Sequence, residues 1–380
     1  MQRGFVDDTT FPGGSAAFAM LRKCRRILLN SIALLLDVRT PSSAHARLIN
    51  LTSTLSKQCS DPRDKIYGLL ALLELGPDFY VDYTESAETV FHRAAVAMVQ
   101  APGDRIPLQV LLLAYDLGVS TDIDVRPSWV PDFASESESR MGKEGALAGV
   151  AAFDACGSTL PVVHWDKLRP LVLNVHAYRV TTIETIRVPV REFVGFEQMA
   201  TTCRAKVIAH VEASQTYLHT EPTELWDHIT HGTKSHIGEP DDRMLNQENK
   251  NMLISYLGPF SPGQTIPEDG RLTAEVPWLL GFLLNILTRS REYALCKTVA
   301  GLNGSVPHAA RTGDCILVLA GSTIPWVLRP RPDKGTMCYQ LIGPCYVEGI
   351  MKGEAVLEAA KLQGIGEGEL YRVFEDIHIV

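Results

Sequence analysis

The sequence lacks the excess of basic residues that a nucleic-acid-binding surface needs. Its 380 residues include 36 Lys and Arg against 44 Asp and Glu, which gives a formal net charge of −8 at pH 7. The nearest approach to a basic cluster is the short run at residues 22–26, and such a run is more typical of a solvated helix face. We therefore expect no nucleic-acid partner.

Apolar runs long enough to cross a bilayer are also absent. The longest, residues 27–36 and 276–287, fall short of the ~20 residues that a membrane-spanning helix needs. Near the start, Asp7 and Asp8 stand where a secretory signal would have its apolar segment. The sequence predicts neither a membrane span nor secretion.

No two cysteines have the Cys-x-x-Cys spacing of a redox or zinc motif. Several lie in apolar segments, where a thiol behaves as a small hydrophobic group. Reduced thiols and a cytoplasmic location are expected. The eight cysteines are Cys24, Cys59, Cys156, Cys203, Cys296, Cys315, Cys338 and Cys345.

The common motifs for catalysis and cofactor binding are missing. There is no G-x-x-x-x-G-K-[ST] phosphate loop, no G-x-S-x-G nucleophile elbow and no H-E-x-x-H zinc motif, and the glycines at residues 364–368 predict a turn. His228 and His231, near His236, have a spacing at which two imidazoles can converge on a metal. Because no Cys or carboxylate accompanies them at fixed spacing, a surface position is the favoured interpretation. We expect no cofactor and no metal.

The composition is that of a globular protein, with 46% hydrophobic and 21% charged residues. A chain of this length exceeds what one compact core usually holds, so two domains, or one domain with a large insertion, are expected.

Two helices are predicted in the first third of the chain. Asp61 and Pro62 open the first, because the Asp61 carboxylate can accept from free N–H groups in the first turn and proline fits there. An apolar stripe follows at Ile66, Leu69, Leu70 and Leu73, and residues 76–77 end it. The second helix is capped by Thr84 and buries Ala87, Phe91, Ala94, Ala95 and Met98.

The segment at residues 126–133 contains too much proline for a helix interior or a central strand. It predicts an extended strap anchored in the core by Trp129 and Phe133. Residues 135–149, rich in Ser, Glu and Gly, predict an exposed linker. The expected organisation is a mainly helical region at 1–133, a linker at 134–158 and an α+β region at 159–380.

The second half combines strands with further helices. Residues 171–186 are β-rich, and residues 315–319, 325–329 and 338–343 predict three strands separated by turns. The fold class is therefore α+β, with an N-terminal helical region packed on a mixed region that ends in a small antiparallel β-barrel-like module. Further helices are expected at 17–38, 44–55, 193–219, 221–231 and 276–288, a helix or buried strand at 107–115, and a surface loop at 236–269.

Carboxylates at Asp61, Asp64 and Asp82 suggest acid–base chemistry, although helix capping is the favoured interpretation of Asp61 and Asp64. Arg63 or Lys65 could pair with Asp82 in a structural salt bridge. Hydroxyl groups from Tyr67 and Tyr83 are expected nearby. Any cysteine and histidine could form a nucleophile–base pair, but no linear spacing joins two of them.

Three ordered segments carry a family resemblance. The run CSDPRDKIYGLLAL at 59–72 is similar to the "TDPRDKIYALLGL" stretch of fungal heterokaryon-incompatibility (HET) proteins. The run VDYT at 81–84 and the helix after it resemble "PDYS…EVY", and RPSWVPDF at 126–133 resembles "LPSWVPDW". Towards the end, ARTGD at 310–314, IPWVLR at 324–329 and GPCYVEGIMKGEA at 343–355 are similar to the family's terminal pattern "GD…G…P.vLR…lvG.aYvhGiM.GEA".

The following residues occupy positions of the family motifs, and the resemblance assigns no chemical role to them. They are Asp61, Pro62, Arg63, Asp64, Tyr67, Asp82, Tyr83, Trp129, Pro131, Asp132, Gly313, Asp314, Arg329, Gly349, Met351, Gly353 and Glu354.

The resemblance implies a role in fungal self/non-self recognition or its regulation, through protein contacts. Nothing in residues 1–50 matches the family's "LSYVWG"-like motif, so the chain is expected to begin inside the signature domain. The alternative is a tailoring enzyme (cyclase, isomerase or hydrolase) of a fungal secondary-metabolite pathway, acting on a small molecule. Such an enzyme would need an apolar pocket with convergent polar groups, and the candidates are His164, His176, Tyr178 and Asp132.

Overall fold

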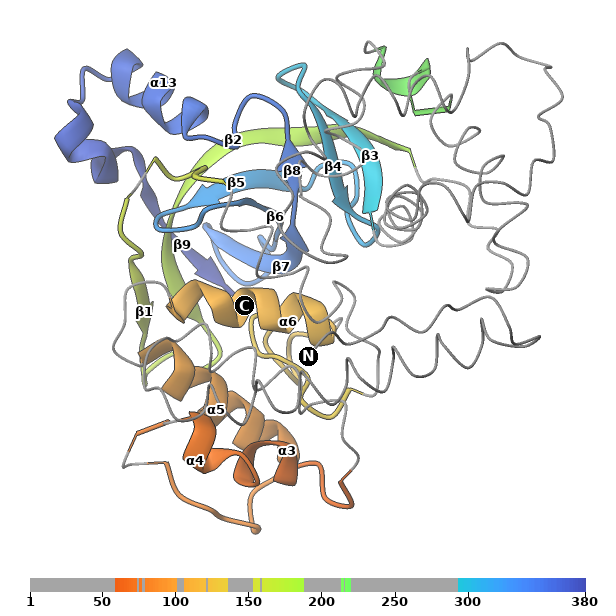
Figure 1. The fold of residues 1–380 in the computed structure, drawn as a ribbon, viewed down its shortest axis with the longest axis vertical. Helices are drawn as coiled ribbons and strands as arrows, with labels where there is room; N and C mark the ends of the chain where they lie inside the picture. The colour runs from red at the N-terminus through yellow and green to blue at the C-terminus, as the bar shows by residue number, and fades with distance from the viewer. Residues whose placement is uncertain are drawn as a thin grey trace, which may run out of the picture.

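A computed structural model describes residues 59–73, 75–76, 79–100, 106–120, 122–135, 153–157, 159–187, 213–214, 216–219 and 293–380. Within these ranges, helices pack below a nine-stranded sheet, and a further helix, α13, lies at its other end (Figure 1). This mixed arrangement of helices and one sheet agrees with the predicted combination of α and β elements.

The first predicted helix is present but broken. It forms α3 (Asp64–Tyr67) and α4 (Leu70–Leu73), separated by a turn at Gly68, so the expected continuous stripe is interrupted. The opening turn begins at Asp61, whose carbonyl accepts the N–H of Asp64 at 3.0 Å. The helix therefore begins two residues later than the Asp-Pro signal suggested, with Arg63 rather than Asp61 at the N-cap.

The second predicted helix is α5 (Ala87–Gln100), and its buried face contains the expected Phe91, Ala94 and Ala95. The predicted cap is wrong by two residues. Ser86 Oγ, rather than Thr84, accepts the first-turn N–H of Thr89 at 3.2 Å. Thr84 instead donates to Asp82, which fixes the loop before the helix.

The apolar run at 107–115, for which helix and strand were both open, forms helix α6 (Ile106–Leu117). It packs across β7 (Cys338–Pro344) at a point where Gly343 removes all side-chain bulk. A Cβ atom at Gly343 would lie 2.4 Å from Cδ2 of Tyr115, so only glycine permits this approach.

The predicted anchoring of the strap is confirmed, but its extended form is wrong, because turns form where the Val130 N–H donates to Pro127 O and the Ser135 N–H donates to Asp132 O, both at 3.0 Å. Residues 126–133 have no helix or strand, and Trp129 and Phe133 are fully buried. Phe133 meets Phe91 of α5 edge to face at 5.3 Å, and the Trp129 indole N–H donates to Leu171 O at 3.2 Å. The strap therefore joins the helices to the sheet.

The sheet contains nine strands, and β2 (Leu173–Arg187) is the longest. The others are β1 (Val163–Trp165), β3 (Tyr293–Thr298), β4 (Asn303–Pro307), β5 (Cys315–Leu319), β6 (Pro325–Pro330), β7, β8 (Tyr346–Val347) and β9 (Glu375–Ile379). The three strands expected at 315–343 are confirmed as β5, β6 and β7.

The strands follow the order β5-β6-β7-β9-β2-β3-β4-β8, and β5 also pairs with β2. Each of β5, β6, β7, β9 and β2 therefore pairs with two others of that set. These pairings support the barrel-like form, which stays a prediction. The expectation of a purely antiparallel module is wrong, because β7 and β9 are parallel. The chain reaches β9 only after α13 (Glu354–Leu362) and a 3-10 helix, η4 (Glu367–Val373), and such a long crossover permits parallel pairing.

One hydrophobic core joins α3, α5, α6, the strap and one face of the sheet; it includes Ile66, Phe91, Trp129 and Leu341. The Asp-Pro helix opening and the strap thus share a core, as the family resemblance requires. Three smaller clusters lie elsewhere in the sheet region, and two of them include side chains of α13.

Several expectations concern residues outside the described ranges. These are the helices at 17–38, 44–55, 221–231 and 276–288, most of the linker, the loop at 236–269, most of the helix at 193–219, and His228, His231 and His236.

Candidate functional site

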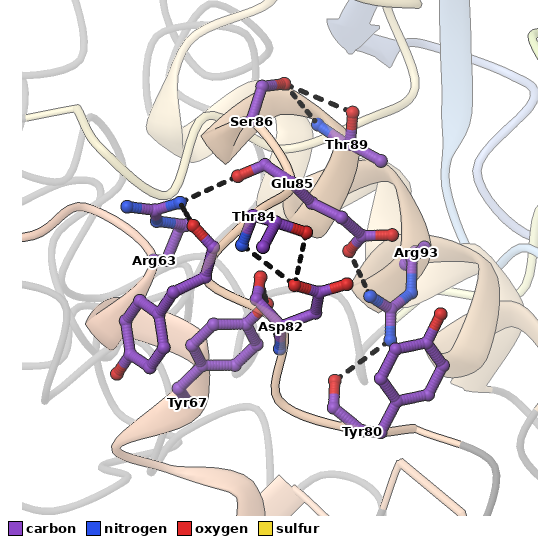
Figure 2. A network of polar contacts seen from close by, with 10 residues as sticks. Arg63, Tyr67, Tyr80, Asp82, Thr84, Glu85, Ser86, Thr89 and Arg93 are labelled. Carbon is purple, nitrogen blue, oxygen red and sulfur yellow. Dashed lines mark hydrogen bonds and ion pairs between the residues drawn. The ribbon is translucent and has the colours of Figure 1, made fainter.

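Arg63 connects the two N-terminal motif segments (Figure 2). It precedes α3, and its guanidinium binds both carboxylate oxygens of Asp61, at 2.9 and 2.7 Å. The remaining Nη1 donates to the carbonyls of Tyr83 and Glu85, at 2.6 and 2.7 Å. Arg63 thus neutralises the charge of Asp61 in its own turn, and it also holds the loop that leads into α5. The expected salt bridge of Arg63 or Lys65 with Asp82 is replaced, for Arg63, by its ion pair with Asp61.

Two tyrosines connect the same segments in the opposite direction. The hydroxyl of buried Tyr67 donates to Asp82 O at 2.8 Å and accepts the N–H of Asp82 at 3.1 Å. The hydroxyl of Tyr83 donates to Asp64 Oδ1 at 2.5 Å. The two rings meet edge to face at 5.1 Å. Each motif segment therefore satisfies polar groups of the other.

Each of the three motif carboxylates already accepts hydrogen bonds. The hydrogen bond from Arg63 lowers the pKa of Asp61, and that from Thr84 lowers the pKa of Asp82. The hydrogen bond to Asp64 raises the pKa of Tyr83. General acid–base work needs a group whose pKa lies near the working pH, so these shifts favour a positioning role for this cluster.

The network continues onto α5 and ends in exposed aromatic side chains (Figure 2). Arg93 forms an ion pair with Glu85, donates to Tyr80 O at 3.0 Å and lies over the Tyr80 ring at 4.2 Å. Tyr80, Val81 and Tyr83 have exposed fractions of 59%, 49% and 51%. We call these three side chains, with Arg63 and Arg93 behind them, the tyrosine surface.

Three of the four candidate catalytic residues lie on one face of β1 and β2. His164 pairs in register with Asn174, and His176 and Tyr178 follow Asn174 at alternate positions. Nε2 of His176 lies 2.8 Å from Oδ1 of Asp376 on β9. Tyr178 is half-buried, and burial raises its pKa. These three residues share a face, but no contact among them tests the predicted enzymatic function, which stays a prediction.

Asp132 lies in the strap rather than on this face. Its Oδ2 is 3.4 Å from Arg126 Nη2, and its Oδ1 accepts the N–H of Ala134 at 3.2 Å. Arg126 also donates to Val130 O at 2.9 Å. These contacts shape the strap.

Two comparisons with known proteins found matches to this chain. Residues 281–363 match the family model described as the Het-6 beta-barrel domain. The chain is also 26% identical over 363 residues to "Heterokaryon incompatibility protein 6, OR allele" from Neurospora crassa; the alignment covers 81% of this chain and 51% of the relative. This chain is therefore similar to heterokaryon-incompatibility proteins in both comparisons. It spans about half the length of its curated relative, and no solved structure matches it.

The HET-family motif in the matched C-terminal region is built around Asp314 and Arg329. Both carboxylate oxygens of Asp314, which is 3% exposed, bind the Arg329 guanidinium, at 2.8 and 2.9 Å. The Arg311 N–H also donates to Asp314 at 2.8 Å, and Arg329 donates to Ala309 O at 2.8 Å. Gly313, at φ +91°, provides the turn. The motif therefore fixes the start of β5 against β6.

The GIMKGEA part of the motif shapes the entry to α13. Gly349 and Gly353 have φ values of +79° and +86°. A Cβ atom at Gly353 would lie 3.0 Å from Gly157 Cα. Met351 is buried, and Glu354 accepts the Lys352 N–H at 2.7 Å. These residues position a helix, and no reacting group lies among them.

Sequence reasoning missed three participants: Glu85 and Arg93 in the network, and Asp376 beside His176. Helical spacing does not relate Glu85 to Arg93, because Glu85 lies in the loop before α5 and only Arg93 lies in the helix. No local signal marks Asp376, whose position depends on long-range pairing of β9 with β2.

No group of three potential metal ligands exists among the residues that the structure describes. In the same part of the chain, no helix has the length and apolar character to cross a membrane.

Proposed function

We propose that this chain acts in fungal self/non-self recognition and that it contacts a protein partner through the tyrosine surface. The first part is supported by the Het-6 beta-barrel match and by the similarity to a heterokaryon-incompatibility protein of Neurospora crassa. The second part is supported by the exposed side chains of Tyr80, Val81 and Tyr83.

The tyrosine surface has the composition of a binding hot spot. Tyrosine and arginine are enriched at protein interfaces, because a rigid ring buries much area at a small entropic cost. Arg93 packs over Tyr80, and the hydroxyl of Tyr83 is held by Asp64. The rings are therefore ordered before a partner arrives, which lowers the cost of binding.

Expression in a fungal host tests the proposal. The unaltered chain should cause growth arrest or a barrage in strains of one incompatibility genotype and have no effect in the other. The double substitution Tyr80→Ala and Tyr83→Ala should abolish that response at unchanged protein level. Tyr371→Ala is the matched control, because Tyr371 is equally exposed at 59% but lies on η4.

Two results would contradict the proposal. A response that does not depend on the genotype of the host would remove the recognition role. A response that survives the double substitution would leave the recognition role in place and remove the tyrosine surface from it.

A further inference from the structure

The turn between β1 and β2, at residues 166–172, carries the most exposed large apolar side chain that the structure describes. Leu168 is 89% exposed, and Leu171 in the same turn is 45% exposed. A single exposed leucine is common on protein surfaces. Here, however, the turn is fixed in place and carries unpaired positive charge on both sides of the leucine.

Hydrogen bonds within the turn fix its backbone. Asp166 Oδ1 accepts the Leu168 N–H at 2.9 Å, and Asp166 O accepts the Arg169 N–H at 3.0 Å. The Val172 N–H donates to Arg169 O at 3.0 Å. Because the tip is already ordered, little conformational entropy remains to be lost when it binds a partner.

The main core and α5 hold the base of the turn. The Trp165 indole N–H donates to Pro170 O at 2.9 Å, and the Trp129 indole N–H donates to Leu171 O at 3.2 Å. Nε2 of His92, on α5, lies 2.6 Å from Pro170 O, where β1 contacts α5 (Figure 1). The turn is therefore attached to buried aromatic side chains while its leucines remain in solvent.

Two cationic side chains flank Leu168. Lys167 and Arg169 are exposed, and neither forms an ion pair with any residue that the structure describes. The carboxylate of Asp166 accepts a backbone N–H of the turn. Lys167 and Arg169 against Asp166 leave the turn with a net positive charge, on a chain whose formal net charge is −8.

This combination fits an anionic lipid surface better than a protein surface. A stable protein interface covers about 800 Å² on each partner, which two leucine side chains do not provide. A lipid surface needs less, because an apolar tip is buried at the boundary of headgroups and acyl chains while basic side chains bind the headgroups. Long Lys and Arg side chains can reach the headgroups when the leucine between them lies deeper.

We propose that the β1–β2 turn binds the surface of anionic membranes, with Leu168 and Leu171 inserted at the headgroup boundary and with Lys167 and Arg169 on the lipid phosphates. The contact is weak and reversible, because two leucines and two cations bury little area and charge. An anionic surface repels the acidic remainder of the chain, so the turn also sets the orientation of the bound protein. This inference does not depend on the recognition role.

Sedimentation of the full chain with lipid vesicles tests this proposal. At millimolar lipid and low salt, the chain should bind phosphatidylcholine vesicles that contain about 30% phosphatidylserine, and it should bind pure phosphatidylcholine about tenfold more weakly. Added salt should weaken the binding, because it screens the headgroup charge. A folded unaltered chain that does not bind the anionic vesicles would overturn the proposal.

Substitutions in the turn locate the contact. Leu168→Asp should weaken binding to anionic vesicles about tenfold or more, because the inserted apolar group is lost, whereas Leu168→Phe should retain binding. The double variant Lys167→Gln and Arg169→Gln should weaken binding to anionic vesicles about tenfold and leave binding to pure phosphatidylcholine unchanged. Leu362→Asp is the matched control, because Leu362 is 82% exposed but lies at the end of α13, and it should bind like the unaltered chain.

Three results would refute the assignment of this turn. Binding that survives Leu168→Asp would place the lipid contact elsewhere. An equal loss in Leu362→Asp would show that the added negative charge, and not the turn, is responsible. Self-association that Leu168→Asp abolishes, in a chain that binds no vesicles, would assign the turn to a protein contact instead. Circular dichroism should show the same melting temperature for all these variants, because every substituted side chain is exposed.

Discussion

The side chain of Tyr67 closes around the backbone of Asp82: its hydroxyl donates to the Asp82 carbonyl at 2.8 Å and accepts the Asp82 N–H at 3.1 Å. The two residues belong to separate family motifs, one at the start of α3 and one in the loop before α5. Their contact joins the two motifs in the folded chain. Tyr67 and Arg63 of the first motif segment bond backbone groups of the second, and Tyr83 of the second bonds the Asp64 carboxylate of the first.

Tyr67→Phe removes both hydrogen bonds and keeps the buried ring, which is 8% exposed. The free energy of unfolding should fall by about 1–2 kcal/mol, because two backbone groups of Asp82 lose their partner. Urea unfolding monitored by circular dichroism measures this loss. Tyr371→Phe, at an exposed position, is the control and should change little. An unchanged midpoint for Tyr67→Phe would mean that water satisfies these groups.

Arg329→Met leaves the buried carboxylate of Asp314 without its bidentate partner. Breaking a buried pair from one side costs about 3–5 kcal/mol, so the melting temperature should drop steeply. The double variant with Asp314→Leu should recover part of the loss, because it also removes the unpaired charge. Differential scanning calorimetry separates these cases. A double variant less stable than Arg329→Met would contradict the ion-pair explanation.

Gly343→Ala tests the close approach of α6 to β7. The added Cβ meets the Tyr115 ring, and φ at this position is +150°. Overpacking and backbone strain together should cost about 2–4 kcal/mol. Gly301→Ala is the matched control: its φ is +79°, but nothing lies within 4 Å of the new Cβ atom. Gly343→Ala should therefore unfold at a clearly lower urea concentration than Gly301→Ala. Equal losses of stability would show that α6 can move away from β7 at little cost.

His92 makes stability depend on pH. It is packed near Trp129 and Trp165, and its Nε2 lies 2.6 Å from Pro170 O. Burial lowers its pKa below the ordinary value of 6.5. The unfolded chain therefore binds this proton more readily than the folded chain, and acidification below about pH 6.5 favours unfolding. Urea unfolding at pH 7.5 and pH 5 should show a larger loss for the unaltered chain than for His92→Gln. Equal losses would exclude His92 as the cause.

Elements defined by local signals were predicted well. The apolar spacing of Phe91, Ala94 and Ala95 predicted the buried face of α5, and the prolines around Trp129 predicted a strap without helix or central strand. In both cases the signal lies within a few residues, and the local backbone preference agrees with the core. The cap of α5 was misplaced because Thr84 and Ser86 are both good caps, and the contact of Thr84 with Asp82 decided between them.

Candidate site residues were predicted by type and motif, but their partners were not. His164, His176 and Tyr178 share a face because β1 and β2 are adjacent. Asp376 reaches His176 only through the pairing of β9 with β2. Likewise, Cys338 and His378 are 40 residues apart in sequence and are neighbours only through the parallel pairing of β7 with β9. Such register depends on the whole sheet, and no short window of sequence contains it.

The sequence alone indicated the family resemblance, the helical character of α5, the buried strap and the strands β5 to β7, because composition, periodicity and ordered motifs act over short distances. Tertiary structure decided which polar groups distant in sequence meet: Arg63 with the loop at Tyr83, Asp314 with Arg329, and His176 with Asp376. The physical reason is that strand register and helix packing minimise the free energy of the entire core at once. A side chain's partner is therefore a property of the assembled fold.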